Sequence, residues 1–449
     1  RYFQRGRERR GFAALADAMV ALAAGEPREA LSKAEKAERL LGRPELTRLI
    51  TAQAAEAAGD RKRAAEAWKA LLADPRTRFV GVRGLMREKL AEGDVETALA
   101  LARKAFELRP RHGETLDTLL ALQNRAHDWH GARTTLAAQL RAGRLPRDVH
   151  ARRDAVLALA EALDRASRGD QEGADRAARE AQRMAPDLVP AAVMAARAEL
   201  RAGNRRAAER ILRRAWKAAG PHPELAAAWA ALEPDETPEA RRRRFARLLS
   251  EHPDDPETRM LEAELALAAE DFPAARRALG DLPETRPTAR VLTLMAAIAK
   301  GQGAPEHEIR GWLARAISAP RDRAWVCEAC GHVHAHWVPL CERCGAFDTL
   351  AWTEPPEGEA GARTTPELLP VIAGLLEAGD RPATEAPEES EEPDAAGAEA
   401  ASAAGGSDAG PAEPAAPESA PPRRASADDT EEVYGDVVVL PASEEPGKS

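Results

Sequence analysis

All four cysteines of this 449-residue chain lie within the segment CEACGHVHAHWVPLCERCG, residues 327–345. They form two Cys-x2-Cys pairs separated by ten residues: Cys327, Cys330, Cys341 and Cys344. Two such pairs can present four thiolates tetrahedrally to one metal ion, and Gly331 and Gly345 suit the tight turns that the pairs require. The spacing therefore predicts a closed, structural zinc site. A rubredoxin-like iron site is the alternative, because the same four ligands serve either metal.

Three other uses of the cysteines are disfavoured by their number and spacing. Disulfides need an oxidising compartment, and proteins stabilised by disulfides usually have more cysteines than these four. A thioredoxin-like redox centre uses one Cys-x2-Cys pair at the end of a strand, not two facing pairs. Covalent haem attachment needs a histidine directly after the second cysteine, whereas Gly331 separates Cys330 from His332.

Three histidines between the cysteine pairs alternate as side chains do along a strand: His332, His334 and His336. They are candidate ligands for haem or for a second metal. Because four cysteines already fill a tetrahedral site, we expect these histidines to be solvent-facing strand residues in a ribbon hairpin. The neighbouring tryptophans are expected to pack over the metal site and to anchor the ribbon: Trp325, Trp337 and Trp352.

Composition favours helices and gives no sign of an enzyme. Alanine and arginine dominate, and aromatic residues make up only 4% of the chain. Residues 381–449 hold 17 acidic and 4 basic residues, which leaves residues 1–380 at +4 out of the formal net charge of −9. That excess is too small to predict nucleic-acid binding. The sequence contains no HExxH, GxSxG or complete phosphate-loop motif, so we expect no enzymatic activity.

A small-residue turn followed five residues later by alanine recurs along the first 320 residues. Steps of 34 residues separate the first four of these turns: Gly25, Gly59, Gly93 and His127. A 34-residue unit of this kind is the tetratricopeptide signature. We therefore predict an all-α, right-handed solenoid of about nine helical hairpins over residues 11–320, with a concave face that binds proteins. The period slips within residues 141–168, where the assignment of helices is least certain.

The rest of the chain divides into further segments. Residues 1–10 are predicted to be a basic juxtamembrane segment, because arginine clusters follow membrane spans on the cytoplasmic side, with a solvated helix start as the alternative for this stretch. Residues 321–356 are predicted to form the four-cysteine ribbon, and residues 364–380 a short helix. Residues 381–449 have the composition of a disordered acidic tail. Within it, residues 431–442 either dock on a partner or have no role, and both interpretations stay open.

The chain resembles the HemY family of bacterial haem-biosynthesis proteins over residues 1 to about 356. The resemblance rests on the opening RGRERRGFAALADAMVALAAGEPREALSKAEKAERLL, the repeat array and the closing WVCEACGHVHAHWVPLCERCGAFDTLAWTEP. It implies two transmembrane helices before Arg1, so we expect an N-terminal segment that this sequence lacks. It also implies an inner-membrane location with the repeats facing the cytoplasm, and a late step of protohaem or tetrapyrrole synthesis. The implied partners are haem-biosynthesis enzymes bound in the concave face.

Two alternatives stay open beside this resemblance. The LapB-type lipopolysaccharide assembly regulators combine one membrane helix, tetratricopeptide repeats and a rubredoxin-like metal site, but the opening segment and the FDTLAW ending favour HemY. For function, the leading hypothesis is a membrane-tethered scaffold that organises or regulates haem-pathway enzymes. The alternative is a direct haem carrier with His332, His334 or His336 as axial ligands.

The position of the ribbon in the chain also suggests a place for it in the fold. The last predicted helix carries Trp312, Leu313 and Ile317 at helical spacing, and the ribbon begins seven residues after Pro320. A solenoid needs a cover over the apolar face of its terminal hairpin. We therefore expect the ribbon to cap the final hairpin.

Overall fold

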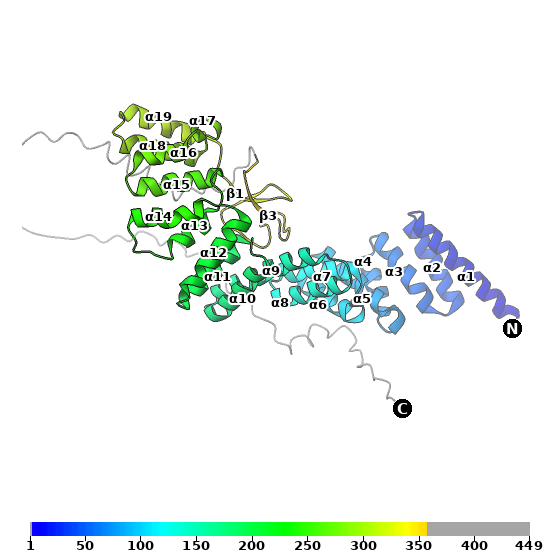
Figure 1. Cartoon of the computed structure of the whole chain (residues 1–449). Coiled ribbons are helices and arrows are strands. Elements are labelled where there is room, and N and C mark those ends of the chain that lie inside the picture. The colour runs from blue at the N-terminus through cyan, green and yellow to red at the C-terminus, as the bar shows by residue number, and fades with distance from the viewer. Residues whose placement is uncertain (1, 357–449) are drawn as a thin grey trace, which may run out of the picture. The chain divides into compact units, whose positions relative to one another are not determined.

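The computed structural model describes residues 2–356, a part of the chain that contains nineteen helices followed by three short strands (Figure 1). The predicted all-α tetratricopeptide architecture with a small cysteine-bearing ribbon is confirmed. Three predicted features lie outside the described residues: the helix over 364–380, the disordered tail over 381–449 and the motif at 431–442. In the described part, no helix has the length and apolar content needed to cross a bilayer.

The helices follow one another as nine hairpins within residues 2–317, and we call their first and second members the A and B helices. The A helices are α1 (Tyr2–Ala23), α3 (Pro44–Ala57), α5 (Pro75–Glu92), α7 (Gly113–Arg125), α9 (Arg147–Ser167), α11 (Val189–Arg201), α13 (Pro223–Ala230), α15 (Pro256–Ala268) and α18 (Ala289–Gly301). The B helices are α2 (Pro27–Leu41), α4 (Arg61–Ala70), α6 (Val95–Leu108), α8 (Trp129–Arg141), α10 (Gln171–Met184), α12 (Arg205–Ala219), α14 (Pro238–Leu249), α16 (Phe272–Leu279) and α19 (Glu306–Ile317). A single additional turn, α17 (Leu282–Thr285), precedes α18.

Two residues explain the recurring turn: one ends the first helix of the hairpin, and the next caps the second helix. Gly59 ends the first helix of its hairpin with a left-handed backbone (φ 76°), a conformation that costs glycine little. Asp60 then caps the next helix by accepting a hydrogen bond from the N–H of the third helical residue, at 3.1 Å. Where glycine is replaced, His127 and Glu270 adopt the same left-handed conformation (φ 55°). The aspartate cap recurs in four further hairpins, at Asp94, Asp128, Asp170 and Asp271.

Alanine five residues after the turn lies where the two helices of a hairpin cross. Six of these alanines are buried: Ala30, Ala64, Ala98, Ala132, Ala174 and Ala208. A methyl group at this position lets two helix backbones approach closely, while longer side chains fill the space between hairpins. The slip in the repeat period has a simple cause, because α9 has 21 residues where the A helices on either side of it, α7 and α11, have 13.

The first helix begins at Tyr2, so residues 2–10 of the arginine-rich segment run without a break into the first hairpin. The ribbon contains a three-stranded antiparallel sheet of order β2-β1-β3. Its strands are β1 (Ala324–Cys327), β2 (Val333–His334) and β3 (Leu350–Thr353). In this register Trp325 of β1 pairs with His334 on one side and Trp352 on the other.

The expectation that the ribbon caps the final hairpin is wrong. The side chains of Trp325, Trp337 and Leu350 belong to one buried cluster with residues of α9 to α15. By contrast, α19 buries no residue, and Ile317 at its end is 87% exposed. The ribbon therefore folds back along the array, and its apolar side chains are buried against those of the middle hairpins.

Candidate metal centre

The two Cys-x2-Cys pairs form turns with the same backbone hydrogen bonds. Gly331 N–H donates to the carbonyl of Cys327, and Gly345 N–H donates to that of Cys341, both at 2.8 Å. In each turn the N–H of the first cysteine donates to the carbonyl five residues later, at 2.9 Å. Both glycines have a left-handed backbone, with φ of 74° and 69°, so the tight turns inferred from the sequence are present.

These turns bring the four sulfur atoms together. All four Sγ atoms lie within 4.8 Å of one another. Sγ of Cys327 is 3.8 Å from that of Cys344, and Sγ of Cys330 is 3.6 Å from that of Cys341. A tetrahedron of sulfurs with metal–sulfur bonds of about 2.3 Å has edges of about 3.8 Å. The group therefore fits one tetrahedral metal ion, and its geometry suits zinc and iron alike.

The surroundings shift the pKa values of Cys327 and Cys330 in opposite directions. Burial raises the pKa of Cys327, but hydrogen bonds from the Thr349 hydroxyl and from the N–H groups of Ala329 and Cys330 outweigh it and lower the pKa to about 6. The N–H of His332 lowers the pKa of Cys330, but burial and the neighbouring thiols outweigh it and raise the pKa to about 12. Four thiols this close resist losing all their protons unless a cation compensates the charge. A divalent ion supplies that compensation.

The three histidines of the ribbon differ in their surroundings. His334 is only 4% exposed, and its Nε2 lies 3.4 Å from Sγ of Cys341. His332 is half-buried with its ring centroid 4.7 Å from that of His334, while His336 is exposed. The expectation of solvent-facing strand residues is therefore wrong for His334. Strand β2 has only two residues, so the alternation suggested by the sequence does not extend to His336.

One side of the ribbon rests on the start of α9. Arg152 Nε lies 3.2 Å from Oδ1 of Asp348, which lies just before β3. Burial raises the pKa of Asp348, and the Arg152 guanidinium opposes that shift. Leu340 and Phe347 of the ribbon also pack against the apolar cluster shared by α7, α8 and α9.

The other side of the ribbon rests on the start of α13 through contacts between rings. His222, the residue that caps this helix, contacts the indoles of Trp325 and Trp352, with centroid distances of 5.3 and 4.2 Å. Trp325 Nε1 donates to Glu224 Oε1 at 3.3 Å. The predicted anchoring role of Trp325 and Trp352 is confirmed by these contacts. Sequence reasoning missed His222 and Glu224, because nothing in their local pattern marks a contact a hundred residues away.

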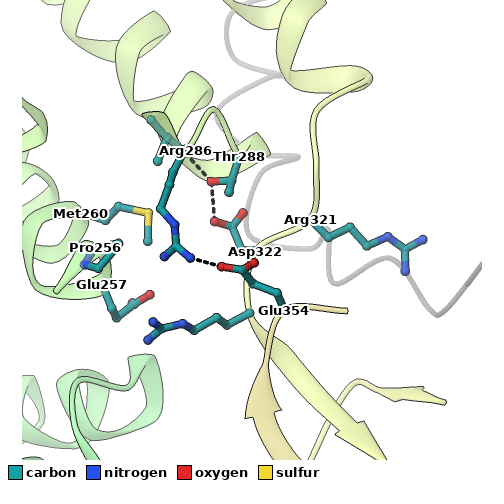
Figure 2. A pocket seen from close by; sticks show the side chains of 10 residues that line it. Pro256, Glu257, Met260, Arg286, Thr288, Arg321, Asp322 and Glu354 are labelled. Atoms are coloured by element: carbon teal, nitrogen blue, oxygen red, sulfur yellow. Dashed lines mark hydrogen bonds and ion pairs between the residues drawn. The ribbon is translucent and has the colours of Figure 1, made fainter. Parts of the chain in front are cut away.

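Residues 320–323, directly before β1, connect the ribbon to the starts of α15 and α18. Asp322 caps α18 by accepting from the Thr288 hydroxyl at 2.6 Å and from the N–H of Arg290 at 3.1 Å. Figure 2 shows this contact together with the ion pair between Arg286 and Glu354. Arg323 lies 3.4 Å from Asp255, the cap of α15. The ribbon, including residues 320–323, thus contacts the N-terminal turns of α9, α13, α15 and α18.

The helical array and its cysteine group define a tetratricopeptide-repeat protein with a candidate four-cysteine metal centre. Residues 233–298 match the tetratricopeptide repeat family model, and residues 1–59 match the model for the HemY protein N-terminus. The two matches support a HemY-type tetratricopeptide-repeat protein, as the resemblance had indicated. The match over the opening segment favours HemY over the LapB-type alternative.

Two solved structures illustrate what the chain is similar to. A tetratricopeptide repeat protein from Parabacteroides merdae is 17% identical, with 53% of this chain and 98% of that chain covered and a TM-score of 0.26. The TPR2AB domain of yeast Sti1, solved as a complex with pHSP90, is 15% identical, with 68% and 98% covered and a TM-score of 0.29. No curated protein matches the chain.

Proposed function

We propose that this protein is a membrane-tethered scaffold that holds or regulates an enzyme of a late step in haem synthesis. The observation that carries the proposal is the match of residues 1–59 to the HemY N-terminus at the head of a tetratricopeptide array. The match links the chain to haem synthesis, and repeats of this kind bind proteins on an extended surface. The same match supports attachment to the bacterial inner membrane, and we propose that the repeats lie on its cytoplasmic side.

The metal centre has a structural role in this proposal. We propose zinc as the ion, held by the cysteine thiolates: Cys327, Cys330, Cys341 and Cys344. With all four positions filled by protein sulfurs, the ion offers no place for a reactive water. A segment as small as residues 321–356 gains much of its folding free energy from such an ion. Its task is to keep the ribbon rigid against the starts of α9 and α13.

The A helices near the N-terminus are the proposed surface for the partner. Successive A helices are linked there by ion pairs, Arg87 of α5 with Glu56 of α3 at 3.2 Å, and Arg83 of α5 with Glu114 of α7. The side chains of Glu56, Arg87 and Glu114 are 42% to 56% exposed, and that of Arg83 is 19% exposed. Farther along the array, the ribbon already covers part of α9 and α13.

A charge reversal in cells that lack the native protein tests the proposal. The full-length protein carrying Arg83→Glu and Arg87→Glu is compared with one carrying Arg176→Glu on the B helix α10, where Arg176 pairs within its own helix with Glu172. Tetrapyrrole intermediates are measured by fluorescence of cell extracts. We expect accumulation in the deletion strain and in the double variant, and normal levels with Arg176→Glu.

The outcomes test the link to haem synthesis, the partner surface and the membrane attachment separately. Normal tetrapyrrole levels in the deletion strain would remove the link to haem synthesis. Accumulation in the deletion strain with full rescue by the double variant would place the partner surface elsewhere. If the native protein is recovered in the soluble fraction of lysed cells, the membrane attachment is wrong.

A further inference from the structure

A second group of metal-binding side chains lies beside the cysteines. The ligand atoms of His332, His334 and Glu342 lie within 4.8 Å of one another, next to Cys341. We propose that these three residues bind a second, exchangeable divalent transition-metal ion. The site is distinct from the four-cysteine group, because the sulfurs of that group already complete a tetrahedron.

The surroundings of His334 are the main argument. Its Nε2 lies 3.4 Å from the sulfur of Cys341, close enough for an Nε2–H group to donate a hydrogen bond to that sulfur. The other nitrogen, Nδ1, then carries a lone pair and lies 3.8 Å from a carboxylate oxygen of Glu342. Two acceptors that face each other repel, and a cation placed between them is attracted by both. Strand β2 holds the backbone at His334 by pairing it with Trp325 of β1.

The remaining geometry allows the ion to bind with small movements. Around an ion with bonds of about 2.1 Å, adjacent ligand atoms are about 3.0 to 3.4 Å apart. The observed 3.8 Å between His334 and Glu342 closes by about half an ångström, and the Glu342 side chain, 72% exposed, is free to turn. His332 supplies a second imidazole beside the first, with 4.7 Å between ring centroids.

The ligand set selects the kind of ion. Two imidazoles and one carboxylate suit zinc, cobalt or nickel rather than calcium or magnesium. Four thiolates with one divalent ion carry a net charge of −2, and this charge favours a second cation close by. Three protein ligands leave positions for water, and the exposed Glu342 opens the site to solvent. We therefore expect weaker binding than at the cysteines, by a factor of at least about 100.

The test uses the complete chain without a histidine tag, reduced and loaded with one equivalent of zinc. Nickel or further zinc is added in equilibrium dialysis, and the bound metal is measured by elemental analysis. We expect a second equivalent in the wild type and in His336→Gln, the matched control in the same histidine run. His332→Gln and Glu342→Gln should keep the first equivalent and lose the second.

A spectroscopic experiment on the unaltered chain gives the same information without variants. Cobalt added to the metal-free protein should produce thiolate charge-transfer absorption that is complete at one equivalent. The second equivalent should add only weaker visible bands. The proposal is overturned if the wild type binds one equivalent alone, or if His332→Gln and Glu342→Gln bind as much metal as the wild type. It is also overturned if His336→Gln loses the second ion, since the ion would then bind along the histidine run.

Discussion

Arg152 and Asp348 are 196 positions apart in the chain, yet Nε of the arginine lies 3.2 Å from Oδ1 of the aspartate. This pair joins the second turn of α9 to the end of the ribbon. Together with the ring contact between His222 and Trp352, it makes the ribbon part of the core of the middle hairpins. The metal centre therefore bears on the stability of α9 to α15, and not only on that of the chain's last described segment.

The first prediction concerns the Arg152–Asp348 pair. Replacing Arg152 with methionine leaves a largely buried carboxylate without its partner, so the free energy of unfolding should fall by about 1 to 3 kcal/mol. The double variant Arg152→Met with Asp348→Asn should lose less than the sum of the single changes, because the buried carboxylate is then gone and Asp187, the other partner of Arg152, is 55% exposed. Urea unfolding of the four proteins gives the coupling energy. Strictly additive losses would mean that the pair contributes nothing.

The second prediction concerns pH. Burial lowers the pKa of His222 to about 3, against about 6.5 in an unfolded chain. Stability that depends on the neutral ring is thus complete above pH 6.5 and decreases as the pH falls below it. Between pH 7.5 and 5.5 the wild type should lose about 1.4 kcal/mol relative to His222→Asn, which keeps a capping side chain but does not titrate.

Urea unfolding of both proteins at each pH provides the measurement. Acid also releases metal from thiolates, so the informative quantity is the difference between the two proteins at the same pH and the same metal content. Parallel pH profiles would show that His222 is not the group responsible.

The third prediction concerns loss of the metal. Replacing Cys341 and Cys344 with serine should release the ribbon from the helix starts that it covers. Hydrogen exchange should then accelerate at least about tenfold in residues 147–153 and 222–226, while α3 and α4 keep their protection. The chelated wild type should behave in the same way. If exchange changes only in residues 306–317, the ribbon acts on the last hairpin and the contacts described above are not the important ones.

The fourth prediction concerns packing between hairpins. A Cβ atom added at Gly84 would lie 2.1 Å from the ring of Trp68, so Gly84→Ala should destabilise the array by about 1 to 3 kcal/mol. Gly311, in α19, is the matched control, because a Cβ there meets nothing within 4 Å. Gly311→Ala should be neutral or stabilising by up to about 1 kcal/mol. Thermal melts of the two variants show the contrast, and equal melting temperatures would contradict the close packing of α5 on Trp68.

The sequence by itself determined the features that depend on local spacing. A left-handed glycine followed by a capping aspartate marks several of the turns, as at Gly59 and Asp60, because both effects act within a few residues. The cysteine group was predictable for the same reason. Each turn closes through hydrogen bonds between neighbours, such as Gly331 with Cys327, and all four sulfurs come from nineteen consecutive residues.

Only the tertiary structure decided where the ribbon lies and what its histidines face. The contacts of Trp325 with His222 and of Asp348 with Arg152 join residues far apart in the chain, and their energies come from burial that no local pattern records. His334 was expected in solvent because alternation implies one exposed face of a strand. The docked sheet buries both residues of β2, and so the ring of His334 lies against the sulfur of Cys341.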